Sequence, residues 1–244
     1  MQRYLLTLQY DGKDFHGWQI QPNGTTVEEV LEKSLSTLLR HDVNVVGAGR
    51  TDAGVHARKM TCHFDEEETI GDLSQLMYKL NRLLPASICV MDIQPVPDSL
   101  HARFSAKQRT YHYYIHTKKD AFLNRYSCLI SYTLDFEKMN KAAQMLTEHQ
   151  DFGAFCKTGS DIKTTLCTVT EALWVKMDEH RYYFTITANR FLRNMVRAVV
   201  GTLIEVGRGR ITLLDFQKII ESGTRSDAGE SMPADALFLE DVKY

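Results

Sequence analysis

A single acid lies among cations in the glycine-rich stretch from Gly47 to Arg58. The acid is Asp52, with Arg50 two residues before it and His56 and Arg58 four and six residues after it. Glycines suit a loop with positive φ angles or close backbone approach. On such a loop a neighbouring cation keeps a carboxylate ionised and oriented, as a catalytic acid or nucleophile requires. The competing interpretation is that Asp52 only caps a turn, which is common for aspartate beside glycine.

The same stretch does not match a nucleotide-binding loop. No Gly-Lys-Ser/Thr follows the glycines, and the third glycine is too far along for the dinucleotide spacing. The five cysteines are scattered without a Cys-x-x-Cys pair, which favours buried small side chains in a reducing compartment. Cys62-His63 is too small a cluster for a metal site. We therefore expect no metal and no cofactor.

A second stretch, from His101 to His116, interleaves cations with aromatic side chains and contains no acid. That composition suits a surface that follows a phosphate backbone and offers faces on which bases can stack. An exposed strand whose alternate residues happen to be cationic would look the same. Composition alone leaves both interpretations open.

A third stretch predicts an apolar helix that begins after Asn189, as N-cap, and ends at Gly207. In such a helix Arg190, Arg193 and Arg197 would share one face. Arg197 lies within apolar surroundings, where an arginine needs an acidic partner or a phosphate. The alternative is an arginine whose head reaches solvent at the rim of the helix.

The elements that must position these residues follow from hydrophobic periodicity and capping signals. In the first half the predicted order is strand, helix, strand, strand, helix, strand, which is a ferredoxin-like arrangement with an antiparallel sheet and helices on one face. The second half repeats strands and helices in a similar way. The main predicted strands are at 4–10, 43–46, 59–65, 87–96, 109–116, 127–132, 164–176 and 181–187. The predicted helices lie after Thr25-Thr26, at 72–84, from Asp135 and from Thr212 to Gly223.

Gly49 to Ala57 resembles the signature of the TruA family of tRNA pseudouridine synthases. Four further stretches resemble motifs of that family and occur in its order: Tyr10 to Gln19, His101 to Tyr113, Phe191 to Gly201, and Met232 to Leu239. The resemblance covers nearly the whole chain. One departure is Ala236, which stands where the family motif usually has glycine and therefore questions the local loop conformation.

The resemblance implies roles for three residues. Asp52 would be the catalytic residue and nucleophile, Arg197 would pair with it, and Tyr111 would stack on the target base and is a candidate acceptor of the C5 proton. Whether Asp52 attacks C1′ of the sugar or C6 of the base, or instead opens a glycal route, is left undecided. Cationic residues near these motifs are expected to bind the substrate, together with Tyr111: Arg50, His56, Arg58, Arg103, Lys107, Arg109 and Arg193.

The same resemblance implies a pseudouridine synthase fold of class α+β, with two ferredoxin-like, RRM-like halves and an active-site cleft between them. We expect the halves to be residues 1–105, which carry the Asp52 loop, and 106–244, which carry Tyr111 and Arg197. The implied reaction converts uridine to pseudouridine at positions 38, 39 and 40 in the anticodon stem-loop of tRNA. The implied assembly is a homodimer.

Overall composition indicates the cellular compartment, but it neither indicates nor excludes an RNA partner. The chain of 244 residues is 43% hydrophobic and has a net charge of −2, so an RNA-binding surface must be local. Its apolar runs are too short to cross a membrane, and its start lacks a signal-peptide pattern. We expect a cytoplasmic protein without a membrane partner.

Two other classes of function remain open at this stage. A non-catalytic RNA-binding protein of ferredoxin-like fold would carry similar aromatics and cations, although it gains nothing from an acid facing phosphates. A carboxylate hydrolase such as a nucleosidase usually needs a second carboxylate or a metal, and neither is visible near the motif. A pseudouridine synthase that acts on another RNA is a further alternative.

Overall fold

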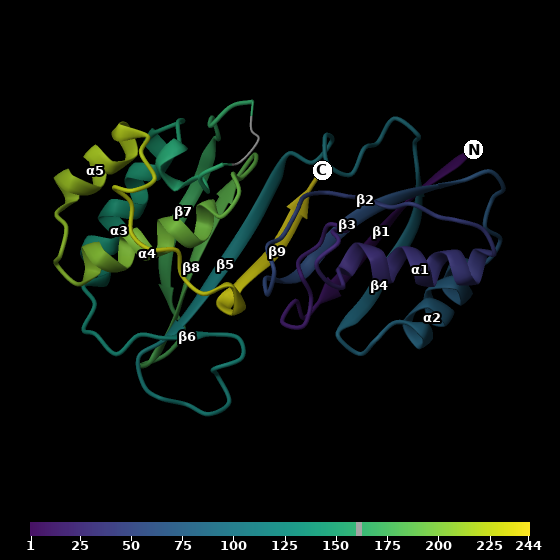
Figure 1. Ribbon diagram of the computed structural model, residues 1–244, viewed down its shortest axis with the longest axis horizontal. Helices are drawn as coiled ribbons and strands as arrows, with labels where there is room; N and C mark the ends of the chain where they lie inside the picture. Colours follow the sequence, from purple (N-terminus) through teal and green to yellow (C-terminus); the bar gives the residue numbers. More distant parts are fainter. Residues whose placement is uncertain (160–162) are drawn as a thin grey trace. The chain divides into compact units, whose positions relative to one another are not determined.

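The chain forms two compact units, and both mix α-helices with β-strands (Figure 1). The computed structural model describes residues 1–159 and 163–244. One unit comprises Met1–Lys107 and Phe238–Tyr244, and the other comprises Gln108–Leu237. Strand pairing is mostly antiparallel within the described residues, so the predicted α+β class is confirmed. The domains 1–105 and 106–244 stay a prediction, and the compact units differ from them by placing the C-terminal strand with the first unit.

The strands of the first unit lie in the order β4-β1-β3-β9, and the short β2 pairs with β3. Pairing is antiparallel for β1 with β3 and with β4, and parallel for β3 with β9. The strands are β1 (Gln2–Tyr10), β2 (Val46–Gly47), β3 (His56–Glu66), β4 (Ile88–Val96) and β9 (Leu237–Lys243). The parallel neighbour β9 comes from the far end of the sequence, which local periodicity cannot reveal.

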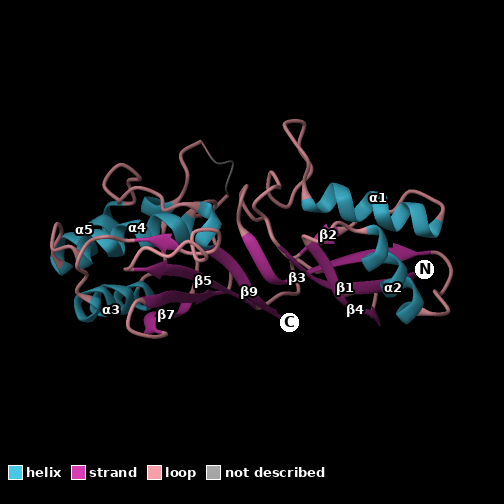
Figure 2. Cartoon of the chain, turned by 90° about the horizontal axis from the view of Figure 1, so that it is seen from below, coloured by secondary structure: helices cyan, strands magenta, loops and turns pink. Residues whose placement is uncertain are grey.

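Two helices complete the first unit, α1 (Val27–Leu39) and α2 (Leu73–Leu83). Both helices begin where the sequence predicted them. The Thr26 hydroxyl accepts from the amide of Glu29, which is the predicted cap, and the Asp72 carboxylate accepts from the amide of Gln75. Helix α1 lies along the strands of this unit (Figure 2). The core between them is formed by fully buried side chains of β1, β3 and the helices, among them Leu6, Leu8, Leu31, Leu35, Met60 and Leu80.

The second unit has three longer strands in the order β5-β8-β7, all antiparallel, and a short β6 parallel to β5. Three helices, α3, α4 and α5, pack against one another. Asp135 caps α3, and Thr212 with Asp215 forms a capping box at the start of α5, as predicted. The elements are β5 (Gln108–His116), β6 (Cys128–Leu129), β7 (Val169–Lys176), β8 (Arg181–Ala188), α3 (Phe136–Met145), α4 (Met195–Gly207) and α5 (Leu213–Ser222).

Helix α4 differs from its prediction at the N-terminal end. It begins at Met195 after Asn194, which has a positive φ of 66°, so the expected helical turn from Arg190 is wrong. The physical reason is the use of Asn189: its side chain accepts from the amide of Thr168 at 2.8 Å and does not cap a helix. Consequently the expected helical face shared by Arg190, Arg193 and Arg197 does not exist.

Ala236 fits the backbone without strain. It lies in a short 3-10 helix (Ala234–Ala236) and is fully buried. In the described chain the only non-glycine residues with positive φ are Arg40 and Asn194. An alanine is therefore compatible with this turn, and the departure from the family motif does not disturb it.

Candidate active site and RNA-binding residues

Asp52 is half-buried on the loop between β2 and β3. Its neighbour Thr51 is held twice: Tyr10 Oη lies 2.8 Å from Thr51 Oγ1, and the amide of Trp18 donates to the Thr51 carbonyl at 3.2 Å. The Asp52 carbonyl accepts from the amide of Val55 at 3.1 Å, which closes the turn. The loop that carries the acid is thus fixed by β1 and by the segment that follows it.

Two glycines in the segment that follows β1 allow the Asp52 loop to pack closely against that segment. A Cβ at Gly12 would lie 1.9 Å from the carbonyl oxygen of Val55, and one at Gly17 would lie 2.5 Å from that of Thr51. Gly17 and Gly54 also have positive φ, +88° and +81°. From the sequence, only the glycines of the loop itself were predicted to shape its backbone. Gly12 and Gly17 were missed as supports, although both lie in the N-terminal stretch that resembles a family motif.

His56 is buried beneath the loop, with 1% of its surface exposed. Its Nδ1 accepts from the amide of Gly12 at 3.0 Å and also lies 3.0 Å from a carboxylate oxygen of Asp11. One ring nitrogen cannot accept from Gly12 and donate to Asp11 at once, so these contacts are alternatives set by the proton on the ring. The ring stacks on Phe238 of β9 at 4.6 Å. This placement favours a positioning role, and the substrate contact predicted for His56 stays a prediction.

Arg50 and Arg58 flank Asp52 and are both exposed. Arg50 makes no hydrogen bond or ion pair with any residue that the structure describes, which leaves its guanidinium available to a ligand. Arg58 lies against β9: its Nε is 3.3 Å from a Glu240 carboxylate oxygen, and its guanidinium stands 5.0 Å from the centre of the Phe238 ring.

The loop from His101 to Lys107 presents a cation and an aromatic ring together. Its backbone is tied down because the Ala102 amide donates to His63 Nδ1 at 3.1 Å. Arg103, Phe104 and Lys107 are exposed, Phe104 by 77%, and the Arg103 guanidinium lies 5.7 Å from the Phe104 ring centre. An exposed aromatic ring beside a cation suits base stacking. Phe104 was not among the predicted substrate-binding residues, although its position between two cations was the signal.

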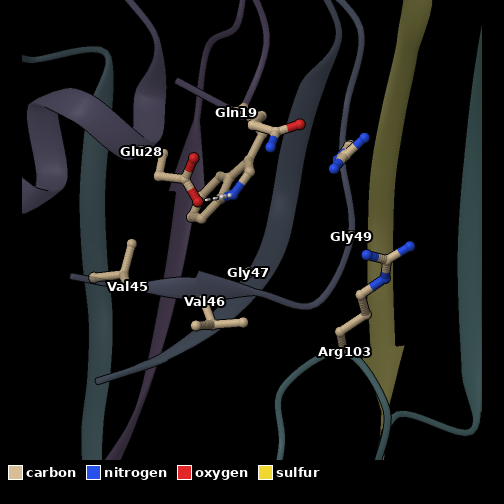
Figure 3. A pocket seen from close by; sticks show the side chains of 9 residues that line it. Gln19, Glu28, Val45, Val46, Gly47, Gly49 and Arg103 are labelled. Carbon is tan, nitrogen blue, oxygen red and sulfur yellow. Dashed lines mark hydrogen bonds between the residues drawn. The ribbon is translucent and has the colours of Figure 1, made fainter. Parts of the chain in front are cut away.

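A pocket of about 200 Å³ opens beside the Asp52 loop in the first unit. Its wall includes the side chains of Trp18, Glu28, Val46, Arg50 and Arg103 (Figure 3). Trp18 Nε1 donates to Glu28 Oε1 at 3.2 Å, so the acid and the indole hold each other in place. No motif in the sequence marks the helix that carries Glu28 as part of a binding site.

Tyr111 and Arg109 lie on β5 in the second unit and are half-buried. The Tyr111 ring meets Phe191 edge-on, with ring centres 5.1 Å apart and planes at 87°. That contact fixes the ring plane, which a stacking residue needs. Arg109 Nη1 donates to the carbonyl of Asn189 at 2.8 Å, so part of its guanidinium is already used within the unit.

Arg197 lies in the first turn of α4 and is half-buried. Its Nε donates to the carbonyl of Met232 at 2.6 Å, and the Met232 amide donates to the Arg197 carbonyl at 3.1 Å. The segment that provides Met232 crosses α4 at Gly201, where an added Cβ would lie 1.9 Å from the carbonyl oxygen of Glu230. Arg193 precedes the helix and is exposed. The pairing of Arg197 with Asp52 stays a prediction.

Among the described residues, no group of three or more His, Cys, Asp or Glu side chains is placed so that it could hold a metal ion. None of the helices in the described ranges combines the length and hydrophobicity that a membrane span requires.

An α+β protein that carries an acid on a firmly held glycine loop, with arginines and aromatic rings nearby, has the features of an enzyme acting on RNA. Comparison with known proteins specifies the family. A family model described as tRNA pseudouridine synthase matches residues 7–105 and 142–244. The chain therefore belongs to the tRNA pseudouridine synthase family, and it is an isomerase that forms pseudouridine from uridine in tRNA.

Individual relatives match over the whole of this chain. The tRNA pseudouridine synthase A of Parabacteroides distasonis is 53% identical over 244 residues, covering 100% of this chain and 96% of that protein. The protein of the same name from Bacteroides thetaiotaomicron is 52% identical over 246 residues, covering 100% and 91%. A more distant one from Caldicellulosiruptor bescii is 38% identical over 246 residues and covers 100% of both chains.

Proposed function

We propose that this enzyme modifies uridines 38, 39 and 40 in the anticodon stem-loop of tRNA. In the reaction the bond from C1′ to N1 breaks, the base turns, and a bond from C1′ to C5 forms. N1 gains a proton and the C5 proton is lost to solvent, so no redox partner is required. The target base lies in a structured RNA and must leave its stack before it can react. Support for these positions comes from the family motifs, and the names of the relatives do not specify them.

Asp52 is the proposed nucleophile. The observation that carries this assignment is the seating of its loop, where Thr51 is held by both Tyr10 and Trp18. A carboxylate held on a fixed backbone loses little freedom when it meets the reacting carbon, which lowers the entropic part of the barrier. Whether it attacks C1′ or C6, or opens a glycal route, is a separate question about the same group.

Arg197 and Tyr111 complete the proposed machinery. Arg197 would hold the Asp52 carboxylate ionised and oriented, because an arginine–carboxylate pair is strong and directional. Its backbone and its Nε are both bound to Met232, so its remaining nitrogens point in a restricted direction. Tyr111 would stack on the target base and accept the C5 proton.

The proposal includes the architecture and the assembly expected from the family resemblance. Each half, 1–105 and 106–244, would be ferredoxin-like, with the active-site cleft between them. The enzyme would work in the cytoplasm as a homodimer, with one tRNA contacting both subunits. Size-exclusion chromatography with light scattering would then give a mass near twice that of the 28.0 kDa chain.

The experiment is tritium release from 5-tritiated uridine in unmodified tRNA. We expect release by the wild type and none by Asp52→Asn, with tRNA affinity within about threefold of the wild type, because amide for carboxylate removes the nucleophile and little volume. Asp42→Asn is the matched control, since Asp42 is an exposed acid in the same unit. Full activity of Asp52→Asn would refute the assignment.

A second tRNA substrate tests whether uridines 38, 39 and 40 are the sites of modification. A tRNA with cytidine at 38, 39 and 40 should release no tritium while binding normally. Continued release from this tRNA would show that the enzyme acts at other uridines. Release from a different cellular RNA alone would favour the alternative that the substrate is not tRNA.

A further inference from the structure

The pocket beside the Asp52 loop is small. Its volume, about 200 Å³, is below the roughly 300–1,000 Å³ of pockets that take drug-sized ligands. The pocket shares Arg50 with the loop that carries Asp52. A ligand bound there would therefore lie close to the proposed reaction centre within the first unit.

The walls of the pocket differ in chemistry. Figure 3 shows Glu28, Val46 and Arg103 around the same hollow. Val46 is 38% exposed and offers an apolar surface to the face of a base. Arg103 and Arg50 add two guanidinium groups, which suit a phosphate. The apolar wall suits the face of a base, the acid suits the edge of that base, and the two arginines suit a phosphate.

Hydrogen bonds within the first unit hold the carboxylate of Glu28 in place. Glu28 Oε1 accepts from Trp18 Nε1 at 3.2 Å, and Oε2 accepts from the amide of Ile20 at 2.9 Å. A carboxylate has about four acceptor sites, so each oxygen can accept one more hydrogen bond. Trp18 itself can approach this closely because residue 47 is glycine, where a Cβ would lie 2.6 Å from the indole.

The remaining acceptor capacity selects among bases. Guanine offers two adjacent donors, N1–H and the N2 amino group, on the edge that a flipped-out base exposes. Uracil offers one donor there, and adenine and cytosine offer only an exocyclic amino group beside an acceptor. A fixed carboxylate that accepts two parallel hydrogen bonds therefore favours guanine.

We propose that this pocket is a binding subsite for an unpaired guanosine nucleotide of the RNA substrate, with Glu28 reading the base and Arg50 and Arg103 holding its phosphate. The inference rests on the proposed action on RNA and adds a specificity-determining residue, Glu28, to it. Asp52 carries out the reaction, and Glu28 selects the nucleotide that lies beside it.

Intrinsic fluorescence can report binding because the chain has two tryptophans. Trp174→Phe leaves Trp18 as the only one. This replacement removes no hydrogen bond among the described residues, since Trp174 Nε1 is buried without a partner, and a ring remains beside Phe136 and Phe184. The probes are the pentanucleotides UUGUU, UUAUU, UUCUU and UUUUU.

We expect UUGUU to change Trp18 fluorescence with a Kd roughly tenfold below those of the other three. Glu28→Gln should abolish this preference, because an amide offers one acceptor and one donor in place of two acceptors. Arg103→Gln should weaken all four probes alike and keep the preference. Glu32→Gln is the matched control: Glu32 lies one turn further along α1, binds the amide of Val45 at 2.8 Å, and does not line the pocket.

Equal affinity for the four pentanucleotides, or no fluorescence change with any of them, would overturn the proposal. So would a preference for guanine that survives Glu28→Gln, or one that Glu32→Gln removes equally. Tritium release from tRNA by the wild type separates a failure of the guanine subsite from a failure of the proposed uridine positions. Release without guanine preference refutes the subsite only, and guanine preference without release refutes the proposed uridine positions.

Discussion

At the scale of single residues, several titratable side chains near the Asp52 loop support the backbone. His63 is the clearest case: its Nδ1 accepts from the Ala102 amide, and only 4% of its surface is exposed. Burial lowers the pKa of His63 from 6.5 to about 4, and the charges of Arg3 and His101 act in the same direction while Asp65 opposes them. A neutral His63 is therefore part of the folded state that presents Arg103.

This pKa predicts a pH dependence of stability. Between about pH 6.5 and pH 4 the unfolded chain protonates His63 while the folded chain does not, so the stability present above pH 6.5 is lost as the pH falls toward 4. His63→Gln keeps an acceptor for Ala102 and cannot be protonated. From pH 7.5 to pH 5, urea unfolding should show the wild type losing about 1–2 kcal/mol more than the variant. Parallel losses in both proteins would rule out His63 as the cause.

At the scale of elements, helix α4 and the segment that crosses it pack together closely and depend on each other for their positions. Gly201 lets the backbone of Glu230 approach the helix, and Gly229 donates its amide to Thr202 Oγ1 at 2.9 Å. The segment then continues to Met232, whose carbonyl and amide both bind Arg197. The orientation of Arg197 depends on a contact about one turn away along the helix, at Gly201.

Gly201→Ala is predicted to be destabilising, although alanine usually favours a helix by about 1 kcal/mol. The new Cβ would lie 1.9 Å from a carbonyl oxygen, so the crossing segment must shift. We expect a loss of about 1–3 kcal/mol, measured as a thermal midpoint lower by roughly 3–10 °C. Gly71→Ala, where no atom lies within 4 Å of the added Cβ, should change the midpoint little. An unchanged thermal midpoint for Gly201→Ala would show that the segment containing Glu230 can move away from the helix without loss of stability.

At the scale of the whole molecule, the chain returns to its first unit at its C-terminus. Strand β9 pairs with β3 beside His56, and the Lys107 amide donates to the Lys243 carbonyl at 2.7 Å. Tyr244 Oη donates to the Ala102 carbonyl at 2.8 Å and lies 2.6 Å from Thr61 Oγ1. The first unit therefore includes residues Phe238–Tyr244, far along the sequence from the rest of that unit.

Tyr244→Phe removes the hydroxyl from this closure and keeps the ring. Two part-buried hydrogen bonds are lost, so we expect a loss of about 1–2 kcal/mol in urea unfolding. Tyr78→Phe is the control, because Tyr78 is 66% exposed. If both variants unfold alike, the terminal hydroxyl contributes nothing measurable.

RNA binding by the whole molecule depends on local charge, because the net charge is only −2. We expect the logarithm of the tRNA association constant to fall linearly with the logarithm of salt concentration, and Arg50→Gln or Lys107→Gln to reduce the slope by roughly one each. Lys141→Gln should leave the slope unchanged, since Lys141 pairs with Glu137 on α3 at 2.7 Å. Filter binding at four salt concentrations measures the slopes. Equal slopes for all four proteins would remove Arg50 and Lys107 from the phosphate contacts.

The sequence by itself determined the features that depend on near neighbours along the chain. Helices begin after Thr26, Asp72, Asp135 and Thr212, close to the predicted starts, and each of these residues caps its helix by binding an amide three residues further along. The strand pattern and the motifs around Asp52 led to the α+β class and to the family. Periodicity, capping and motif spacing are local properties, so they can be read without coordinates.

Only the tertiary structure decided the features that depend on distant backbone. Asn189 resembles a helix cap, but its side chain binds Thr168 across the end of the β7–β8 pair, and α4 therefore starts later. His56 looks available for substrate, but Gly12 and Phe238 from the two ends of the chain enclose it. Glu28 looks like an ordinary residue of a first helical turn, but it binds Trp18 and lines the same pocket as Arg103. Each of these outcomes is set by contacts across long sequence separations, which spacing along the chain does not encode.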